Sequence, residues 1–133
     1  AETVGDVVGY KVRLESRTSG RTRVTFCTTG VALRRIAAEP DLANISHVIV
    51  DEAHERSEDG DFILMVLRRL LSRRDDLKLV IMSATLDTQL FCSYFADAPA
   101  LCVPGRTFPV RALYLEDALQ LTKHCVRPNA EWA

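Results

Sequence analysis

Two short, largely apolar runs constrain the fold most: HVIV at residues 47–50, and LKLVIM at residues 77–82, in which Lys78 is the one charged residue. A continuous apolar run of this length, bounded by polar residues, is typical of a parallel strand that is covered on both faces. The leucine-rich residues 59–76 between them are long enough for a helix, with acids at its start and arginines near its end, as the helix dipole favours. Strand, crossover helix and strand predict two parallel strands of one sheet.

Similar units are expected on either side of this one. Before residue 28, apolar residues alternate with polar ones, as in a strand. In the segments after residue 28 and after residue 85, apolar residues recur at the spacing of a helix. We therefore predict an α/β domain, doubly wound around a mainly parallel sheet with helices on both faces. The further elements expected are strands at 7–16, 22–28, 100–105 and 108–115, and helices at 29–40, 86–97 and 116–125.

Composition excludes several classes of protein. With 133 residues the chain has the size of one domain, and its net charge of −1 predicts no partner, so nucleic-acid binding would depend on local charge. The four cysteines show no CxxC spacing, which argues against a zinc site or a disulfide framework and favours a reducing compartment. No apolar run approaches the roughly 20 residues of a membrane span. We expect an intracellular protein with no membrane partner, in the cytoplasm or nucleus rather than the mitochondrion.

Two adjacent carboxylates follow the first apolar run directly. In open α/β sheets, ligands bind at the carboxyl ends of the strands, and that is where Asp51 and Glu52 fall. Such a pair suits metal-assisted phosphoryl transfer, with Asp51 as the better partner for Mg²⁺, through water, and Glu52 as the better base. The alternative is that one of the acids only caps a following turn.

Two hydroxyl-containing motifs follow other strands at the same expected edge. Ser83, Ala84 and Thr85 come after the second apolar run, and Thr28-Thr29-Gly30 precedes the helix expected from residue 29. Ser83-Ala84-Thr85 taken alone is often just a tight turn and a helix cap, whereas Thr28-Thr29-Gly30 could hold a phosphate at a helix N-terminus or only begin a helix. Arg34, one turn along that helix, could approach phosphates or only solvate the helix.

Taken together, these blocks resemble one family. VIVDEAHERS, then LKLVIMSATLD after about 25 residues, with FCTTGVALR before and VPGRTFPV after, stand in the order found in DEAH-box ATP-dependent RNA helicases. The blocks span most of residues 8–110. YLEDAL near the end is more similar to the RNA helicase A-like branch than to the splicing-factor branch.

The resemblance implies a RecA-like domain, the first of two in a helicase core, that uses ATP and Mg²⁺. By the family's pattern Asp51 would hold Mg²⁺, Glu52 would activate the hydrolytic water and His54 would link the nucleotide site to the SAT motif and to the neighbouring domain. Coupling of hydrolysis to strand separation would fall to Ser83, Ala84 and Thr85. Thr28, Thr29 and Gly30 would lie against the RNA backbone. Arg34 is the further RNA contact that we expect, from its place on the helix after them.

The phosphate-cradling loop GxxxxGK[ST] that such an ATPase requires does not occur in these 133 residues. We therefore expect residues 1–115 to be the C-terminal portion of the ATP-binding domain, incomplete at its N-terminal part, with 116–133 a helical segment leading out of it. The expected partners are RNA, the rest of the helicase chain with its P-loop segment and second RecA-like domain, and ribonucleoprotein or activator proteins. The segment alone should then be inactive. The alternative is a shortened, inactive RNA- or protein-binding module derived from a helicase.

Overall fold

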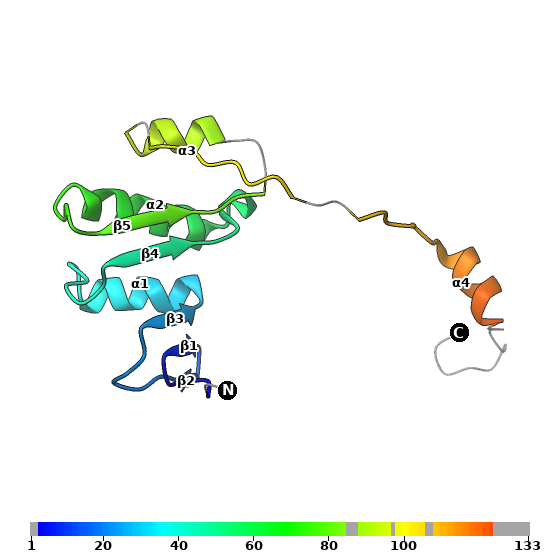
Figure 1. Cartoon of the computed structure of the whole chain (residues 1–133), viewed down its shortest axis with the longest axis horizontal. Helices are drawn as coiled ribbons and strands as arrows, with labels where there is room; N and C mark the ends of the chain where they lie inside the picture. The colour runs from blue at the N-terminus through cyan, green and yellow to red at the C-terminus, as the bar shows by residue number, and fades with distance from the viewer. Residues whose placement is uncertain (1–2, 85–87, 97, 106–107, 124–133) are drawn as a thin grey trace. The chain divides into compact units, whose positions relative to one another are not determined.

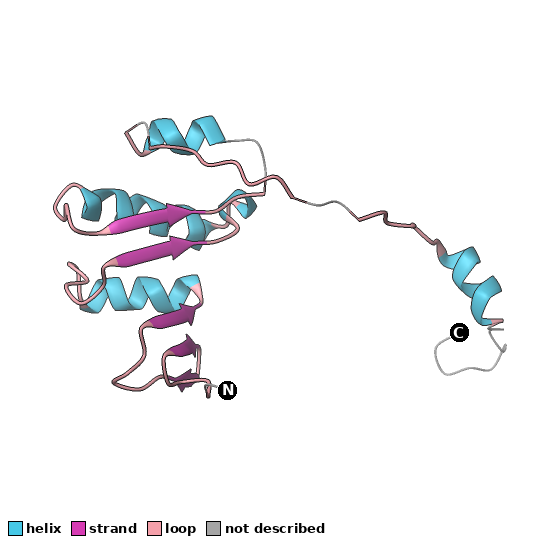
Figure 2. Cartoon of the chain, in the orientation of Figure 1, coloured by secondary structure: helices cyan, strands magenta, loops and turns pink. Residues whose placement is uncertain are grey.

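The computed structural model describes residues 3–84, 88–96, 98–105 and 108–123. The chain falls into two compact units, residues 1–100 and 101–133. The first contains all of the strands in the described chain, together with its longest helices, and both the acidic pair and the TTG motif lie in it (Figures 1 and 2). Its elements are β1 (Val8–Val12), β2 (Glu15–Arg17), β3 (Val24–Cys27), α1 (Thr29–Ala38), β4 (His47–Val50), the 3₁₀ turn η1 (Ala53–Glu55), α2 (Glu58–Leu71), β5 (Lys78–Ile81) and α3 (Thr88–Tyr94).

The single strand predicted over residues 7–16 is wrong, because the chain reverses within it. β1 and β2 are antiparallel and Val12 is paired with Glu15, so only two residues form the turn. The second of them, Leu14, has a φ of 82° and is fully exposed. β1 also pairs in parallel with β3. Gly9 is needed in β1, since a Cβ there would lie 2.3 Å from the carbonyl oxygen of Arg17.

The predicted strand–helix–strand unit is confirmed. β4 and β5 are parallel neighbours, with Val48 opposite Leu79 and Val50 opposite Ile81. The inner face of this pair packs against α1 and α2, which share one hydrophobic core with the loops beside them. The buried members of the core are Ile36, Leu42, Ile63, Leu67, Leu70 and Leu77.

The prediction of one sheet with helices on both faces is confirmed only in its α/β character and its parallel pairing. In the described part of the chain, β2-β1-β3 and β4-β5 are separate small sheets. Val48 and Val50 face the helices, whereas Ile49 and Val80 on the other face are 60% and 45% exposed. The described residues therefore show a sheet covered on one side, and a complete doubly wound fold is not seen in them.

The helix predicted over residues 59–76 begins and ends earlier. Ser57 caps it by accepting the Gly60 N–H, and the helix stops at Leu71, where the Ser72 hydroxyl donates to the Arg69 carbonyl. A serine that bonds a carbonyl three residues back competes with the continuing helix.

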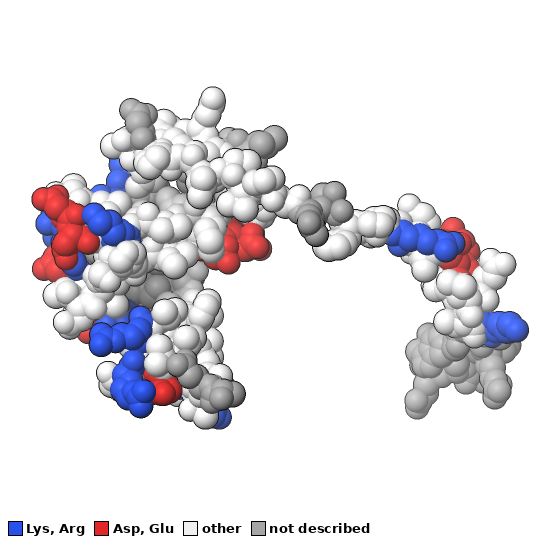
Figure 3. Space-filling model, viewed as in Figure 1, with Lys and Arg blue, Asp and Glu red and all other residues white. Residues whose placement is uncertain are grey.

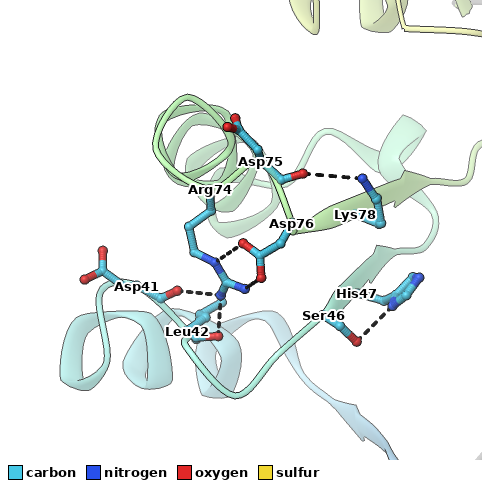
Figure 4. Close-up of polar contacts among 8 residues, drawn as sticks. All are labelled: Asp41, Leu42, Ser46, His47, Arg74, Asp75, Asp76 and Lys78. Atoms are coloured by element: carbon cyan, nitrogen blue, oxygen red, sulfur yellow. Dashed lines mark hydrogen bonds and ion pairs between the residues drawn. The ribbon is translucent and has the colours of Figure 1, made fainter.

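Arg74, just beyond the end of α2, joins three parts of the chain (Figure 4). Its Nη1 donates to the carbonyl oxygens of Asp41 and Leu42 at 2.8 and 2.7 Å, and its Nε donates to Asp76 Oδ1 at 2.9 Å. Nη2 also pairs with the Asp76 carboxylate. Leu42 lies in the core with a φ of 45°, so the guanidinium satisfies the carbonyl of a buried residue in a left-handed conformation. The loop before β4 is thereby tied to the loop before β5.

The strands predicted at 100–105 and 108–115 are wrong for every residue of them that the structure describes. Leu101 and Val110 are 89% and 91% exposed. A strand exists only where a neighbour accepts and donates its backbone hydrogen bonds, and the described residues supply none here.

The helix expected near residue 116 is confirmed as α4 (Leu115–Thr122), in which the Asp117 carboxylate accepts the Tyr114 N–H. Among the described residues, no helix has the length and apolar character that crossing a membrane requires.

Removing the centre of the core should destabilise the fold strongly. Leu67 is fully buried, so Leu67→Ala should lower the free energy of unfolding by roughly 2–5 kcal/mol through lost burial and a remaining cavity. Urea unfolding followed by circular dichroism measures the change. Leu14→Ala is the matched control, because that leucine is fully exposed and its truncation should cost little.

Replacing Arg74 should cost stability in a pH-dependent way. Hydrogen bonding to Arg74 lowers the pKa of Asp76, so this pair stabilises the fold fully above the ordinary aspartate pKa of about 4 and the stabilisation is lost as the pH falls through the lowered value. Arg74→Gln should therefore differ most from wild type near neutral pH and less in acid. Arg73→Gln is the control, since Arg73 only approaches Asp41 at 3.7 Å. An equal loss at every pH would contradict the contribution of the Asp76 pair.

Candidate functional site

The carboxyl ends of β4 and β5 are joined by backbone hydrogen bonds that continue past the strands. The Met82 N–H donates to the Val50 carbonyl at 2.8 Å, and the Ala53 N–H donates to the Met82 carbonyl at 3.0 Å. The segment after β4 and the segment after β5 therefore run side by side, as expected of parallel neighbours.

The acidic pair lies in a tight turn at this edge. Glu52 is left-handed, with φ 51° and ψ 38°, and its carbonyl accepts the Glu55 N–H at 3.0 Å to open η1. Asp51 Oδ1 accepts the Glu52 N–H at 2.9 Å. Ala53 is buried, while both carboxylates are exposed. The Glu52 side chain caps no helix, and the cap of α2 is Ser57, so Glu52 stays available for chemistry.

His54 lies between the acidic pair and the SAT motif. Its Nδ1 is 3.3 Å from the Ala84 N–H nitrogen and 3.3 Å from Glu52 Oε2. A neutral ring with a lone pair on Nδ1 accepts from Ala84, whereas only a protonated Nδ1 can donate to Glu52. One ring atom thus contacts two of the motifs that the sequence singled out.

The turn leaves η1 through a second left-handed residue. Arg56, with φ 50° and ψ 40°, donates from Nε and Nη2 to the two carboxylate oxygens of Asp61 at 2.8 and 2.9 Å. This guanidinium lowers the pKa of Asp61. Sequence reasoning missed the pair, because a spacing of five residues across a helix start follows neither helical nor strand periodicity.

The TTG motif begins α1, as predicted. Thr28 is the N-cap residue, although its side chain makes no capping hydrogen bond. A side chain at Gly30 would begin 3.7 Å from Asp59 Oδ2, so this motif lies near the first turn of α2. Arg34 is exposed and its Nε donates to the Gly30 carbonyl at 3.3 Å.

Two predicted features remain open at this site. Thr85 lies outside the described residues, whereas Ser83 and Ala84 directly follow Met82 and are exposed. Among the described residues no three His, Cys, Asp or Glu side chains gather to hold a metal ion. The exposed oxygens of Asp51 are hard donors of the kind Mg²⁺ prefers, and an ion held by one carboxylate with water and phosphate oxygens fits this arrangement.

The sequence of the chain is similar to those of known helicases. Residues 3–91 match the family model of the DEAD/DEAH box helicases. The chain is 50% identical over 128 residues to the DExH-box ATP-dependent RNA helicase DExH1 of Arabidopsis thaliana. The aligned residues cover 96% of this chain and 13% of that protein. It is 48% identical over 132 residues to the putative ATP-dependent RNA helicase DHX57 of Homo sapiens, covering 99% of this chain and 10% of that protein.

A third relative is the ATP-dependent RNA helicase dhx29 of Xenopus laevis, 48% identical over 124 residues, covering 93% of this chain and 9% of that protein. The chain thus spans about a tenth of the length of these relatives. The family match covers more than half of the chain and contains the acidic turn, the SAT motif and the TTG motif. The chain belongs to the DEAD/DEAH box helicases, and its DEAH sequence and its relatives place it among the DExH/DEAH-box proteins.

Proposed function

We propose that this chain supplies the hydrolytic carboxylates of the first RecA-like domain in an ATP-dependent RNA helicase, which couples ATP hydrolysis to RNA unwinding or ribonucleoprotein remodelling. The observation that carries the proposal is the junction of the two strand ends through Val50, Met82 and Ala53. It holds two adjacent carboxylates beside the SAT motif at the ligand edge of the sheet.

The two carboxylates would have different roles. Asp51 would hold Mg²⁺ through water, and the ion would neutralise charge on the phosphates. Glu52 would accept a proton from the water that attacks the γ-phosphorus, while the bond between that phosphorus and the bridging oxygen breaks and ADP leaves. The exposed Glu52 carboxylate at a left-handed turn suits this role, because it is presented outside the sheet rather than packed into it.

His54 would carry the state of this site to the SAT motif. Its contacts with Ala84 and Glu52 support that role, since a shift of either segment changes what Nδ1 can bond. Ser83 and Thr85 would complete the coupling segment, and the P-loop segment and second RecA-like domain of the parent chain would complete the ATP site.

The RNA-contacting part of the proposal is supported by the distribution of charge. The near-zero net charge conceals a basic segment, since residues 8–36 contain only Glu15 as an acid. In Figure 3 basic side chains show below α1, beside the loop that precedes β3, with an acidic side chain next to them. Within this segment Arg34 Nε donates to the Gly30 carbonyl at 3.3 Å, and backbone N–H groups at the start of α1 suit a phosphate. The basic residues are Lys11, Arg13, Arg17, Arg21, Arg23, Arg34 and Arg35.

Removing the base tests the ATPase assignment. In the full-length parent, Glu52→Gln should lower the rate of ATP hydrolysis by about a hundred-fold or more while ATP still binds, because the amide cannot take the proton. Phosphate release and nucleotide binding measure the two effects. Glu55→Gln is the matched control, an exposed acid one turn away that should leave turnover unchanged. Normal turnover in Glu52→Gln would defeat the assignment.

Removing a phosphate contact tests the RNA surface. Arg34→Gln in the parent should weaken RNA binding about equally for all sequences and reduce the salt slope of the affinity by about one. Fluorescence anisotropy at several salt concentrations measures both quantities. Arg69→Gln on the exposed side of α2 is the control, and equal effects of the two substitutions would exclude a specific role of Arg34.

A further inference from the structure

The acidic turn is bounded by two residues in an unfavourable backbone conformation. Glu52 and Arg56 have φ values of 51° and 50°, and neither is glycine. Residues held in the left-handed region persist only when surrounding contacts hold them, and they gather at functional sites. The segment between them, η1, contains Ala53, which is buried, and His54.

The two ends of this turn are held differently. At the entrance two backbone N–H groups are held: that of Ala53 donates to the Met82 carbonyl, and that of Glu52 donates to the Asp51 carboxylate. At the exit, side chains contribute: the Arg56 guanidinium and the Asp61 carboxylate form two parallel hydrogen bonds at 2.8 and 2.9 Å. A fork of this kind fixes direction as well as distance.

The fork is better suited to fixing geometry than to stabilising the fold. The Arg56 and Asp61 side chains are 52% and 44% exposed, and exposed ion pairs contribute little stability. Asp61 lies in the first turn of α2, whose buried residues anchor it in the core. The fork therefore connects the turn that bears Glu52 and His54 to the most firmly packed helix described.

We propose that Arg56 and Asp61 are a positioning pair for the ATP site, in which the fork between them holds the left-handed exit of the acidic turn and so fixes the directions of Glu52 and His54. The inference rests on the proposed function. Arg56 and Asp61 would act on the reaction only through the positions of Glu52 and His54. Misplacing a catalytic group by about 1 Å can cost up to a hundred-fold in rate, so a contact of small stability can have a large effect on turnover.

The surroundings of the fork leave room for informative substitutions. Arg56 and Asp61 border a cavity of about 200 Å³, whose other lining residues are Leu64 of α2 and Leu90, Phe91 and Tyr94 of α3. Asp61→Glu keeps the carboxylate, and the cavity beside it offers space for the longer side chain to reach Arg56. Asp61→Asn keeps the size of the side chain and removes its charge. Arg56→Asn removes the fork with a residue that tolerates the left-handed conformation.

The test uses RNA-stimulated ATP hydrolysis by the full-length parent. Asp61→Asn and Arg56→Asn should each lower kcat by about ten- to a hundred-fold, with the KM for ATP changed less than two-fold. Asp61→Glu should recover most of the lost kcat. Because Arg74 and Asp76 form a second fork at the far end of α2, Asp76→Asn is the matched control: it should lower the thermal midpoint with kcat unchanged.

The outcomes separate the two proposals. Unchanged kcat in Arg56→Asn, or no recovery in Asp61→Glu when that variant is folded, overturns the positioning role. If Asp76→Asn also lowers kcat, and kcat falls in proportion to the thermal midpoint across all of the variants, the positioning role is overturned as well. Normal turnover in Glu52→Gln would instead remove the proposed function and the positioning role together.

Discussion

The candidate site depends on backbone pairing that continues beyond the ends of β4 and β5. Without the hydrogen bonds from Met82 to Val50 and from Ala53 to Met82, the two polar segments would leave the sheet in independent directions. The parallel register decides which residues meet, because a shift by one position would turn Val48 and Val50 out of the core. The core below the sheet and the chemistry at its edge therefore constrain one another.

Much of this arrangement could be predicted from the sequence, because its signals are local. The apolar runs at 47–50 and 77–82 predict parallel strands, and parallel strands bring the residues after their carboxyl ends to one edge. The turn at Arg13 and Leu14 could not be predicted, since neither residue is a usual turn former and alternation continues through it. The strands predicted near residues 101 and 110 failed because no described neighbour completes a ladder there.

An arginine fork lies near each end of α2, and the two differ in their surroundings. The Arg74 side chain is 12% exposed and bonds the carbonyl of buried Leu42, so its loss acts on the packing of loops over the core. The Arg56 side chain is 52% exposed and borders the acidic turn. The same pair of chemical groups thus serves stability at one end and orientation at the other. Periodicity finds neither fork, because Arg56 and Asp61 lie on the two sides of a helix start, and Arg74 and Asp76 lie together in the loop after α2.

The left-handed backbone of Glu52 limits what substitutions at this position can reveal. A glycine there would remove the carboxylate and also release the backbone, since glycine adopts both hands freely. An alanine would keep the strain but lose the side chain that reaches towards His54. Glutamine alone preserves shape, length and backbone preference while removing basicity. The difference between glutamate and glutamine at residue 52 therefore reports the contribution of a proton acceptor. The further difference between glutamine and glycine includes the contribution of the held backbone conformation.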